Sequence, residues 1–353
     1  MVSAHPRNIG EDDYLAPVPD TPFWNEAMAT MVADGATGIS ASLYISRWWG
    51  KPVIMRHMIA FLLPGNRAVF ARNYGTPPDT RTPHVAGFEI TPLGDGRIRY
   101  TYDGPMDLRR QSDVASYGLG SGPTVRVTFD LIFSSRLPVW DLQATHPSGH
   151  KTDPLFPGGH AEQLGQLDGI VTIDGATFEL KRASTCRDHS RGVRDWSAHH
   201  SHMWLNTEFE SGWGFCSFQS SVVGRPGIAL NAAVLFKDGK TIPATMHTAG
   251  QLKPGDDIWR PFEIVLKPVG IEPIAIQVGD LWNCWPFGIY DPGDLYWGVP
   301  AGVPDPRAFW TTEQSGVFRV RGEIGYGRVE RCNRDIIVDD LWRRSVSPDK
   351  FAR

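Results

Sequence analysis

The sequence has no long apolar run, no excess of basic residues and few cysteines. None of its apolar segments approaches the roughly 18 residues that a membrane-spanning helix needs, and the nearest is 58–64. Lysine and arginine number 35 against 39 aspartates and glutamates, a formal charge of -4, which argues against a nucleic-acid partner. The four cysteines form no CxxC pair, and the first residues show no export signal. We therefore expect a cytoplasmic protein with reduced thiols.

Nucleotide-binding signatures are also missing. The sequence has no GxGxxG after a strand, no GxxxxGK(S/T) and no GxSxG. A glycine-rich segment at 118–122 precedes a strand pattern rather than opening a helix. We expect a protein without a cofactor.

Helical signals are few. Residues 23–32 follow Thr21 as an N-cap and Pro22 at the first helical position, which predicts one helix. Residues 335–344 predict a second, short one. The 37 glycines and 28 prolines are typical of turns between strands, since long helices tolerate neither residue well.

Alternating hydrophobicity is the strongest local signal. In 124–134 apolar residues occupy every second position from 125 to 133, which predicts a half-exposed antiparallel strand. Asp-Gly pairs, which favour type I′ hairpin turns, begin at positions 34, 95, 103, 168, 174 and 238. Two of them sit in complete hairpin patterns at 170–180 and 233–242. The sequence therefore predicts an all-β protein of antiparallel barrels or sandwiches.

The length indicates more than one domain. A chain of 353 residues exceeds what a single hydrophobic core usually organises. A loop-rich segment at 135–165 lies near the middle. We place the boundary after residue 190, with an N-terminal domain over 1–190 and a C-terminal domain over 191–353.

One stretch, 187–204, stands apart from the rest of the chain. Its eighteen residues include three arginines, two aspartates, four histidines and two tryptophans, with almost no aliphatic side chains. This composition is typical of a buried polar network, in which arginine and aspartate pair and aromatic rings exclude water. The network is either a functional site or a structural hub of ion pairs that joins the two domains.

The run Arg-Asp-His-Ser-x-Gly-x-Arg-Asp-Trp at 187–196 resembles the Asp-His-x-x-Gly signature of the hydroxyneurosporene synthase (carotenoid 1,2-hydratase)/AttH-like superfamily. Segments 169–175, 203–204, 212–215 and 322–330 are similar to the same pattern, although the family usually has tryptophan where this chain has Arg191. The resemblance implies two lipocalin-like antiparallel β-barrels packed together around a ligand cavity. It also implies a hydrophobic small-molecule substrate, terpenoid, steroid-like or prenylated. Whether the protein forms a homodimer is left open.

The resemblance suggests acid catalysis, because hydrating an isolated alkene needs a strong, positioned proton donor. Asp188 is the first candidate, Asp195 its rival, and His189 would orient the acid or a water molecule. Glu323 and Glu330 lie on a predicted strand, and Glu323 is a further candidate acid. Residues expected to bind substrate are Arg191, Trp196, His200, Trp204, Trp213, Trp282 and Trp285.

Three histidines also raise the question of a metal. On a regular strand His200 and His202 would share a face, with His199 beside them, but the sequence shows no evident third ligand. We therefore expect no metal. The leading function is a hydratase or a related lyase or isomerase; the alternatives are a non-catalytic carrier of lipids or isoprenoids and a pericyclase that shapes its substrate.

Overall fold

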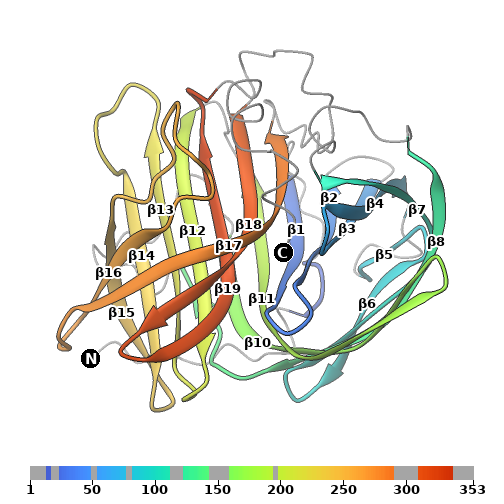
Figure 1. Ribbon diagram of the computed structural model, residues 1–353, viewed down its shortest axis with the longest axis horizontal. Coiled ribbons are helices and arrows are strands. Elements are labelled where there is room, and N and C mark those ends of the chain that lie inside the picture. Colours follow the sequence, from blue (N-terminus) through green and yellow to red (C-terminus); the bar gives the residue numbers. More distant parts are fainter. Residues whose placement is uncertain are drawn as a thin grey trace.

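The structure, a computed structural model, describes residues 13–16, 24–48, 54–76, 82–111, 122–142, 159–193, 198–289 and 309–336. Strands in these ranges form two closed antiparallel barrels that lie side by side (Figure 1). The predicted fold class, all-β with two lipocalin-like barrels packed together, is confirmed.

The first barrel, at the right of Figure 1, closes through eight strands in the order β4-β3-β2-β1-β11-β10-β8-β7. Its ring strands are β1 (Trp24–Asp34), β2 (Ile39–Trp48), β3 (Ile54–Leu63), β4 (Arg67–Gly75), β7 (Arg97–Arg110), β8 (Thr124–Ser135), β10 (Gly159–Ile173) and β11 (Ala176–Val193). Three short strands attach to this ring: β5 (His84–Val85), β6 (Phe88–Gly94) and β9 (Trp140–Asp141). The closing ladder is short, since residues 67–70 of β4 pair with residues 107–110 of β7.

The second barrel, at the left of Figure 1, closes in sequence order from β12 to β19. Its strands are β12 (His199–Phe209), β13 (Gly214–Val222), β14 (Leu230–Lys237), β15 (Lys240–Thr248), β16 (Phe262–Pro268), β17 (Ile274–Ile289), β18 (Phe309–Val320) and β19 (Glu323–Asn333). Residues 194–197 between the barrels lie outside the described residues, and the domain boundary at residue 190 stays a prediction.

The predicted helix at 23–32 is wrong, because this segment forms β1. Alternate residues of β1 pack on two sides: Met28 and Val32 join the core of the first barrel, while Ala29 and Met31 join a separate cluster outside it. A strand buried on both faces loses the apolar–polar alternation by which strands are recognised. The other predicted helix, 335–344, lies mostly outside the described residues.

The strand at 124–134 was predicted correctly. Its alternating apolar residues all face the core of the first barrel, and they are Val125, Val127, Phe129, Leu131 and Phe133. Both predicted hairpins are present as β10–β11 and β14–β15. Among the Asp-Gly pairs, those at 95, 174 and 238 make tight turns with positive φ at both residues.

The remaining Asp-Gly pairs do not make two-residue turns. Asp34 ends β1 before a longer turn, and Gly169 lies at a β-bulge in β10. Asp103 lies within β7, where its carboxylate pairs with Arg126 of β8 at 2.7 Å on the exposed face. An aspartate can occupy a long strand when its exposed face offers a cross-strand cation.

A buried layer fills the space between the outer walls of the two barrels. We call it the inter-barrel layer; β1–β4 and β9–β11 supply it from one side and β12–β14 and β19 from the other. Its apolar members include Ala29, Met31, Leu164, Trp204 and Phe218. The opposite faces of many of these strands line a barrel interior. The layer is therefore a third hydrophobic core, separate from the two barrel interiors.

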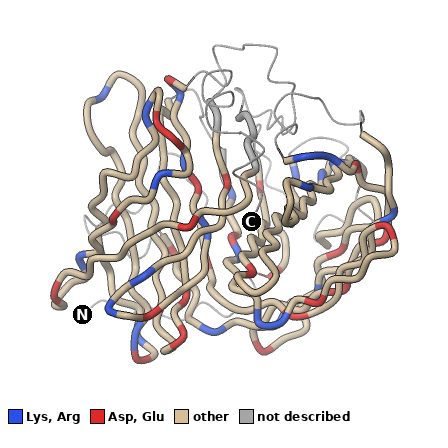
Figure 2. Tube along the Cα trace, viewed as in Figure 1, with Lys and Arg blue, Asp and Glu red and all other residues tan. Residues whose placement is uncertain are grey.

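Charged residues of both signs are mixed over both barrels, in line with the near balance of the composition (Figure 2). Among the described residues, no helix has the length and apolar character needed to cross a membrane.

Candidate active site

Strand β11 divides the Arg-Asp-His run between two environments, because successive side chains on a strand point to opposite faces. Asp188 pairs in register with Ala29 and faces the inter-barrel layer, where its carboxylate lies 2.9 Å from Nε2 of His160. His189 faces the interior of the first barrel, with Nε2 2.9 Å from Oε1 of Glu26. The structure therefore does not bring Asp188 and His189 together.

The layer instead joins Asp188 to two residues of β10, His160 and Glu162. Glu162 pairs in register with Asp188, so the two carboxyl groups point the same way from neighbouring strands. His160 lies between them, with Nε2 2.9 Å from Asp188 Oδ1 and 3.4 Å from Glu162 Oε1. All three residues are buried, and the edge of the His160 ring packs against Trp204.

The protonation of Glu162 is the most informative feature of this group. Burial raises the pKa of its carboxyl group to about 7, with His160 opposing the shift and the charge of Asp188 adding to it. Burial disfavours the charged form of a carboxylic acid, and a nearby like charge disfavours it further. With this pKa a large fraction of Glu162 stays protonated near neutral pH, as a general acid requires.

The second barrel contributes a charged wall to the same layer. Arg328 of β19 lies with its guanidinium carbon 4.2 Å from the centre of the Trp204 ring, and its Nη2 lies 2.5 Å from Oε1 of Glu313. Arg328 also contacts Glu330, which in turn bonds His202. Burial raises the pKa of Glu313 to about 7, although Arg328 opposes that shift. Four polar side chains are thus linked beside Trp204.

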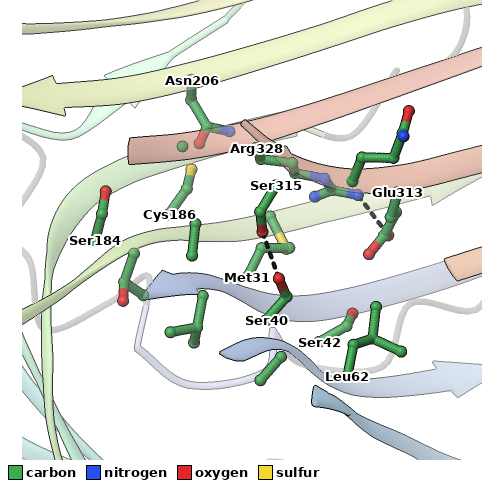
Figure 3. Close-up of a pocket in the computed structure, with 16 residues that line it drawn as sticks. Met31, Ser40, Ser42, Leu62, Ser184, Cys186, Asn206, Glu313, Ser315 and Arg328 are labelled. Carbon is green, nitrogen blue, oxygen red and sulfur yellow. Dashed lines mark hydrogen bonds and ion pairs between the residues drawn. The ribbon is translucent and has the colours of Figure 1, made fainter. Parts of the chain in front are cut away.

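A small cavity lies within the layer, beside Cys186 (Figure 3). Its volume is ≈ 30 Å³, enough for water but far below the size of a bulky ligand. Ser40 of the first barrel and Ser315 of the second hydrogen-bond across it at 2.6 Å. Other polar groups on its wall are Ser42, Ser184, Thr185, Asn206, Glu313, Gln314 and Arg328. Such a lining suits ordered water.

A different polar cluster occupies the interior of the first barrel. Glu26 contacts Arg47 and His189 and accepts a hydrogen bond from the backbone N of Ala16 at 2.8 Å. Burial raises the pKa of Glu26, but His189 and Arg47 outweigh that effect and lower it overall. Arg187 also faces this interior, 2.5 Å from Asp13. These contacts describe a structural ion-pair network.

Of the aromatic residues predicted to bind substrate, Trp204 lies in the layer. Trp213 stacks on Phe209, with ring centres 4.1 Å apart, and its indole N–H donates to Glu323 at 3.2 Å. Glu323, at the β18–β19 hairpin, also accepts a hydrogen bond from Ser211 in the turn between β12 and β13, so it lies away from Asp188. Trp282 packs edge-on against Tyr326.

The other predicted site residues lie elsewhere. His200 bonds Ser221 at 3.3 Å and Asp335 at 3.1 Å, on the exposed side of β12. Arg191 is half-buried on β11, opposite Glu26 in register. The structure gives only the backbone of Trp285 on β17, and Asp195 and Trp196 lie outside the described residues.

Sequence reasoning missed His160 and Glu162, because residues 135–165 were interpreted as loop. The available signal was the His-x-Glu spacing after Gly159, which on a strand places both side chains on one face. Arg328 and Glu313 carried no comparable signal, because their meeting with Trp204 depends on strand register in the second barrel.

Three solved structures share this fold. A putative AttH from Nitrosomonas europaea has 12% identity and a TM-score of 0.58, covering 90% of this chain and 99% of its own. Kievitone hydratase from Nectria haematococca has 12% identity and a TM-score of 0.51, covering 88% of each chain. CghA with Sch210972 has 12% identity and a TM-score of 0.52, covering 88% of this chain and 89% of its own. The predicted resemblance to the AttH-like superfamily is thereby confirmed at the level of the fold.

Sequence comparison gives a more limited result. No protein of curated function matches the chain. One family, described as a domain of unknown function (DUF7064), matches residues 10–266, which is well over half of the sequence. The chain therefore belongs to the DUF7064 family.

Proposed function

We propose that this protein is an acid–base enzyme, a hydratase or a related lyase or isomerase, that acts on an apolar small molecule at the inter-barrel layer without a nucleotide cofactor. The layer has to open to admit this substrate, because its cavity of ≈ 30 Å³ holds only water. The observation that carries the proposal is the buried Glu162, whose carboxyl pKa of about 7 leaves it protonated beside His160 and Asp188. A carboxylic acid held neutral near physiological pH is a suitable proton donor for a weakly basic substrate such as an alkene.

Each residue of the group has a distinct part in hydration. The Glu162 proton adds to one alkene carbon, the π electrons form the new C–H bond, and the other carbon becomes a cation. Water adds to this cation and gives up a proton to His160, which lies between the two carboxyl groups. His160 returns a proton to Glu162, so the cycle closes with one water added. Asp188 favours the charged imidazole in the intermediate state.

The residues around Glu162 exclude bulk water from it and also form a small cavity that can hold an ordered water molecule. Trp140 lies opposite Glu162 in register and is fully buried, while Trp204 packs against His160. The small cavity begins at Cys186, whose Sγ lies 3.8 Å from Oε2 of Glu162. A water molecule held there lies beside Cys186, which is two residues along β11 from Asp188, the register partner of Glu162. Such a source of water supports hydration or its reverse.

The charged layer also favours an enzyme over a carrier. A carrier of apolar molecules needs an apolar cavity, and buried charges beside it would oppose binding and cost stability. Kievitone hydratase, which shares the fold, is a hydratase by name. That likeness agrees with the chemistry proposed from Glu162 but does not identify the substrate.

The test uses purified protein with a panel of prenylated phenols and terpenoid alkenes in ¹⁸O-labelled water, followed by mass spectrometry. We expect a product heavier by one labelled water. Glu162→Gln should lower the rate by about 10²–10⁴-fold. Glu179→Gln, a control on the exposed face of β11, should leave it unchanged. An isomer of unchanged mass would indicate a pericyclase, unchanged ligand retained by the protein a carrier, and a fully active Glu162→Gln variant would remove the proposed acid.

Asp188→Asn tests the same site by removing the negative charge next to Glu162. Its partner is His160 rather than an arginine, so this variant should fold normally. Loss of the Asp188 charge should lower the pKa of Glu162, because that charge helps to raise it. Glu313, whose pKa is also raised to about 7, contributes its own protonated carboxyl band. In difference infrared spectra, the part of the band that Glu162→Gln removes should therefore titrate at lower pH in the Asp188→Asn variant.

A further inference from the structure

Three potential metal ligands converge where the second barrel begins. A β-bulge between His199 and Ser201 interrupts the alternation of β12, so His199 and His202 turn to the same side. Cys332 of β19 is the register partner of His202. Nε2 of His199 lies 2.8 Å from Nδ1 of His202, and Sγ of Cys332 lies 2.9 Å from that Nδ1 and 3.7 Å from Nε2 of His199.

The surrounding structure fixes these groups. His199 and Cys332 are almost completely buried, and the His202 ring stacks on Phe218 with centres 5.5 Å apart. The outer nitrogen of His202 bonds Glu330, and the backbone N of His202 donates to Cys332 Sγ at 3.0 Å. A carboxylate behind a histidine is the usual outer partner of a metal-binding imidazole, where it fixes the tautomer and the ring orientation.

A single proton cannot form hydrogen bonds that join all three atoms. A proton on Nδ1 of His202 can point at His199 or at Cys332 but not at both. A cation between the three atoms would bind all of them at once. Two imidazole nitrogens and a thiolate are a donor set that zinc prefers, with bonds of about 2.0–2.3 Å. Tetrahedral geometry at these bond lengths separates neighbouring ligand atoms by roughly 3.3–3.7 Å. The two shorter distances therefore need to widen by about half an ångström, whereas the distance between Cys332 and His199 already fits.

We propose that His199, His202 and Cys332 form a binding site for a divalent transition metal of the zinc class, with a fourth position left for water or another ligand. This set differs from the His199, His200 and His202 group considered from the sequence, because the bulge directs His200 outward to Ser221 and Asp335. The metal would tie β12 to β19 and hold Glu330 beside Arg328 in the inter-barrel layer. The site does not depend on the proposed acid–base activity.

An alternative use of the same atoms is a nucleophilic cysteine, with His202 as base and Glu330 as the orienting acid. One observation favours the metal. His199 points a second imidazole nitrogen at the sulfur, which a Cys-His-Glu triad does not need.

The test removes metal from the full-length protein with a chelator and then titrates it with Co²⁺. We expect one equivalent to bind, with a sulfur-to-cobalt charge-transfer band and the visible bands of a tetrahedral site, and with displacement by Zn²⁺. Cys332→Ser should abolish the charge-transfer band, and His199→Gln should weaken binding at least about tenfold. His200→Gln, the matched neighbour on the opposite face, should bind as the wild type does.

Thermal unfolding is a second measurement of metal binding, and it does not depend on the cobalt spectrum. A metal bound to the folded state raises the melting temperature, so Zn²⁺ should stabilise the chelated wild type and His200→Gln but not His199→Gln. Absence of Co²⁺ uptake by the wild type, or a charge-transfer band that survives Cys332→Ser, would overturn the site. Stoichiometric alkylation of Cys332 in the metal-free native protein without Co²⁺ uptake would overturn it in favour of the nucleophile.

Discussion

Two buried glutamates, each beside a histidine, lie in different regions of this protein. Glu26 faces the interior of the first barrel with His189, and Glu162 faces the inter-barrel layer with His160. Arg47 also contacts Glu26, and the pKa of Glu26 is lowered. Glu162 has a second carboxylate, Asp188, as its neighbour, and its pKa is raised to about 7. The same pair of residue types thus gives a structural anion in one region and a candidate acid in the other.

The largest expected effect tests the structural side of this comparison. Glu26→Gln removes the buried carboxylate that pairs with Arg47 and should destabilise the protein by about 3–5 kcal/mol. Asp103→Asn breaks the exposed pair with Arg126 and should cause a much smaller loss, because solvent screens that pair. Urea unfolding measures both. Equal, small losses would mean that Glu26 is no more structural than a surface pair.

The next effect has the opposite sign and depends on pH. Folded Glu162 keeps its proton up to about pH 7, whereas an unfolded glutamate loses it near 4.5. Between these values the folded state holds more protons, so its stability falls as pH rises. Glu162→Gln removes this loss and should stabilise the protein by about 3 kcal/mol at pH 8 but by less than about 1 kcal/mol at pH 5. A variant less stable than the wild type at pH 8 would show that Glu162 is ionised and structural.

A smaller effect concerns the aromatic wall of the layer. Trp204→Phe reduces the attraction between the ring and the Arg328 guanidinium and should cost about 1–2 kcal/mol. Trp213→Phe keeps the stacking on Phe209 and should cost less. Thermal unfolding of the two variants, compared with the wild type, separates a tryptophan that supports the charged layer from one that covers a hairpin.

The smallest effect is expected for Glu323. Its carboxylate bonds Ser211 and Trp213 near the surface, away from both buried clusters. Glu323→Gln should change stability by less than about 0.5 kcal/mol and the turnover of any substrate less than twofold. A rate loss comparable with that of Glu162→Gln would return Glu323 to the list of candidate acids.

The sequence predicted those parts of the fold in which a strand has one face in a core and the other in water. The alternation around Phe129 and the turn at Asp174 are examples, because local chemistry determines both. It failed at β1, which is buried on both faces, and at Asp103, which forms a cross-strand ion pair instead of a turn.

The candidate site was predicted in part for a related reason. Asp188 was identified from its local run, but its partners belong to a strand whose start lies 29 residues earlier in the chain. Which residues meet across strands depends on register, and register is a property of the paired sheet. The bulge that brings His199 to His202 was hidden for the same reason.

The short ladder between β4 and β7 has a consequence for local opening of the first barrel. Among the described residues, the strand pairing that closes the first ring runs over 67–70 and 107–110, whereas β10 and β11 pair along most of their length. Local opening of a closed sheet starts where the fewest backbone hydrogen bonds must break together. Amide protons along this ladder should therefore exchange with solvent before those of β10 and β11. The first barrel would then open locally between β4 and β7, while the pairing of β10 and β11 around Glu162 stays intact.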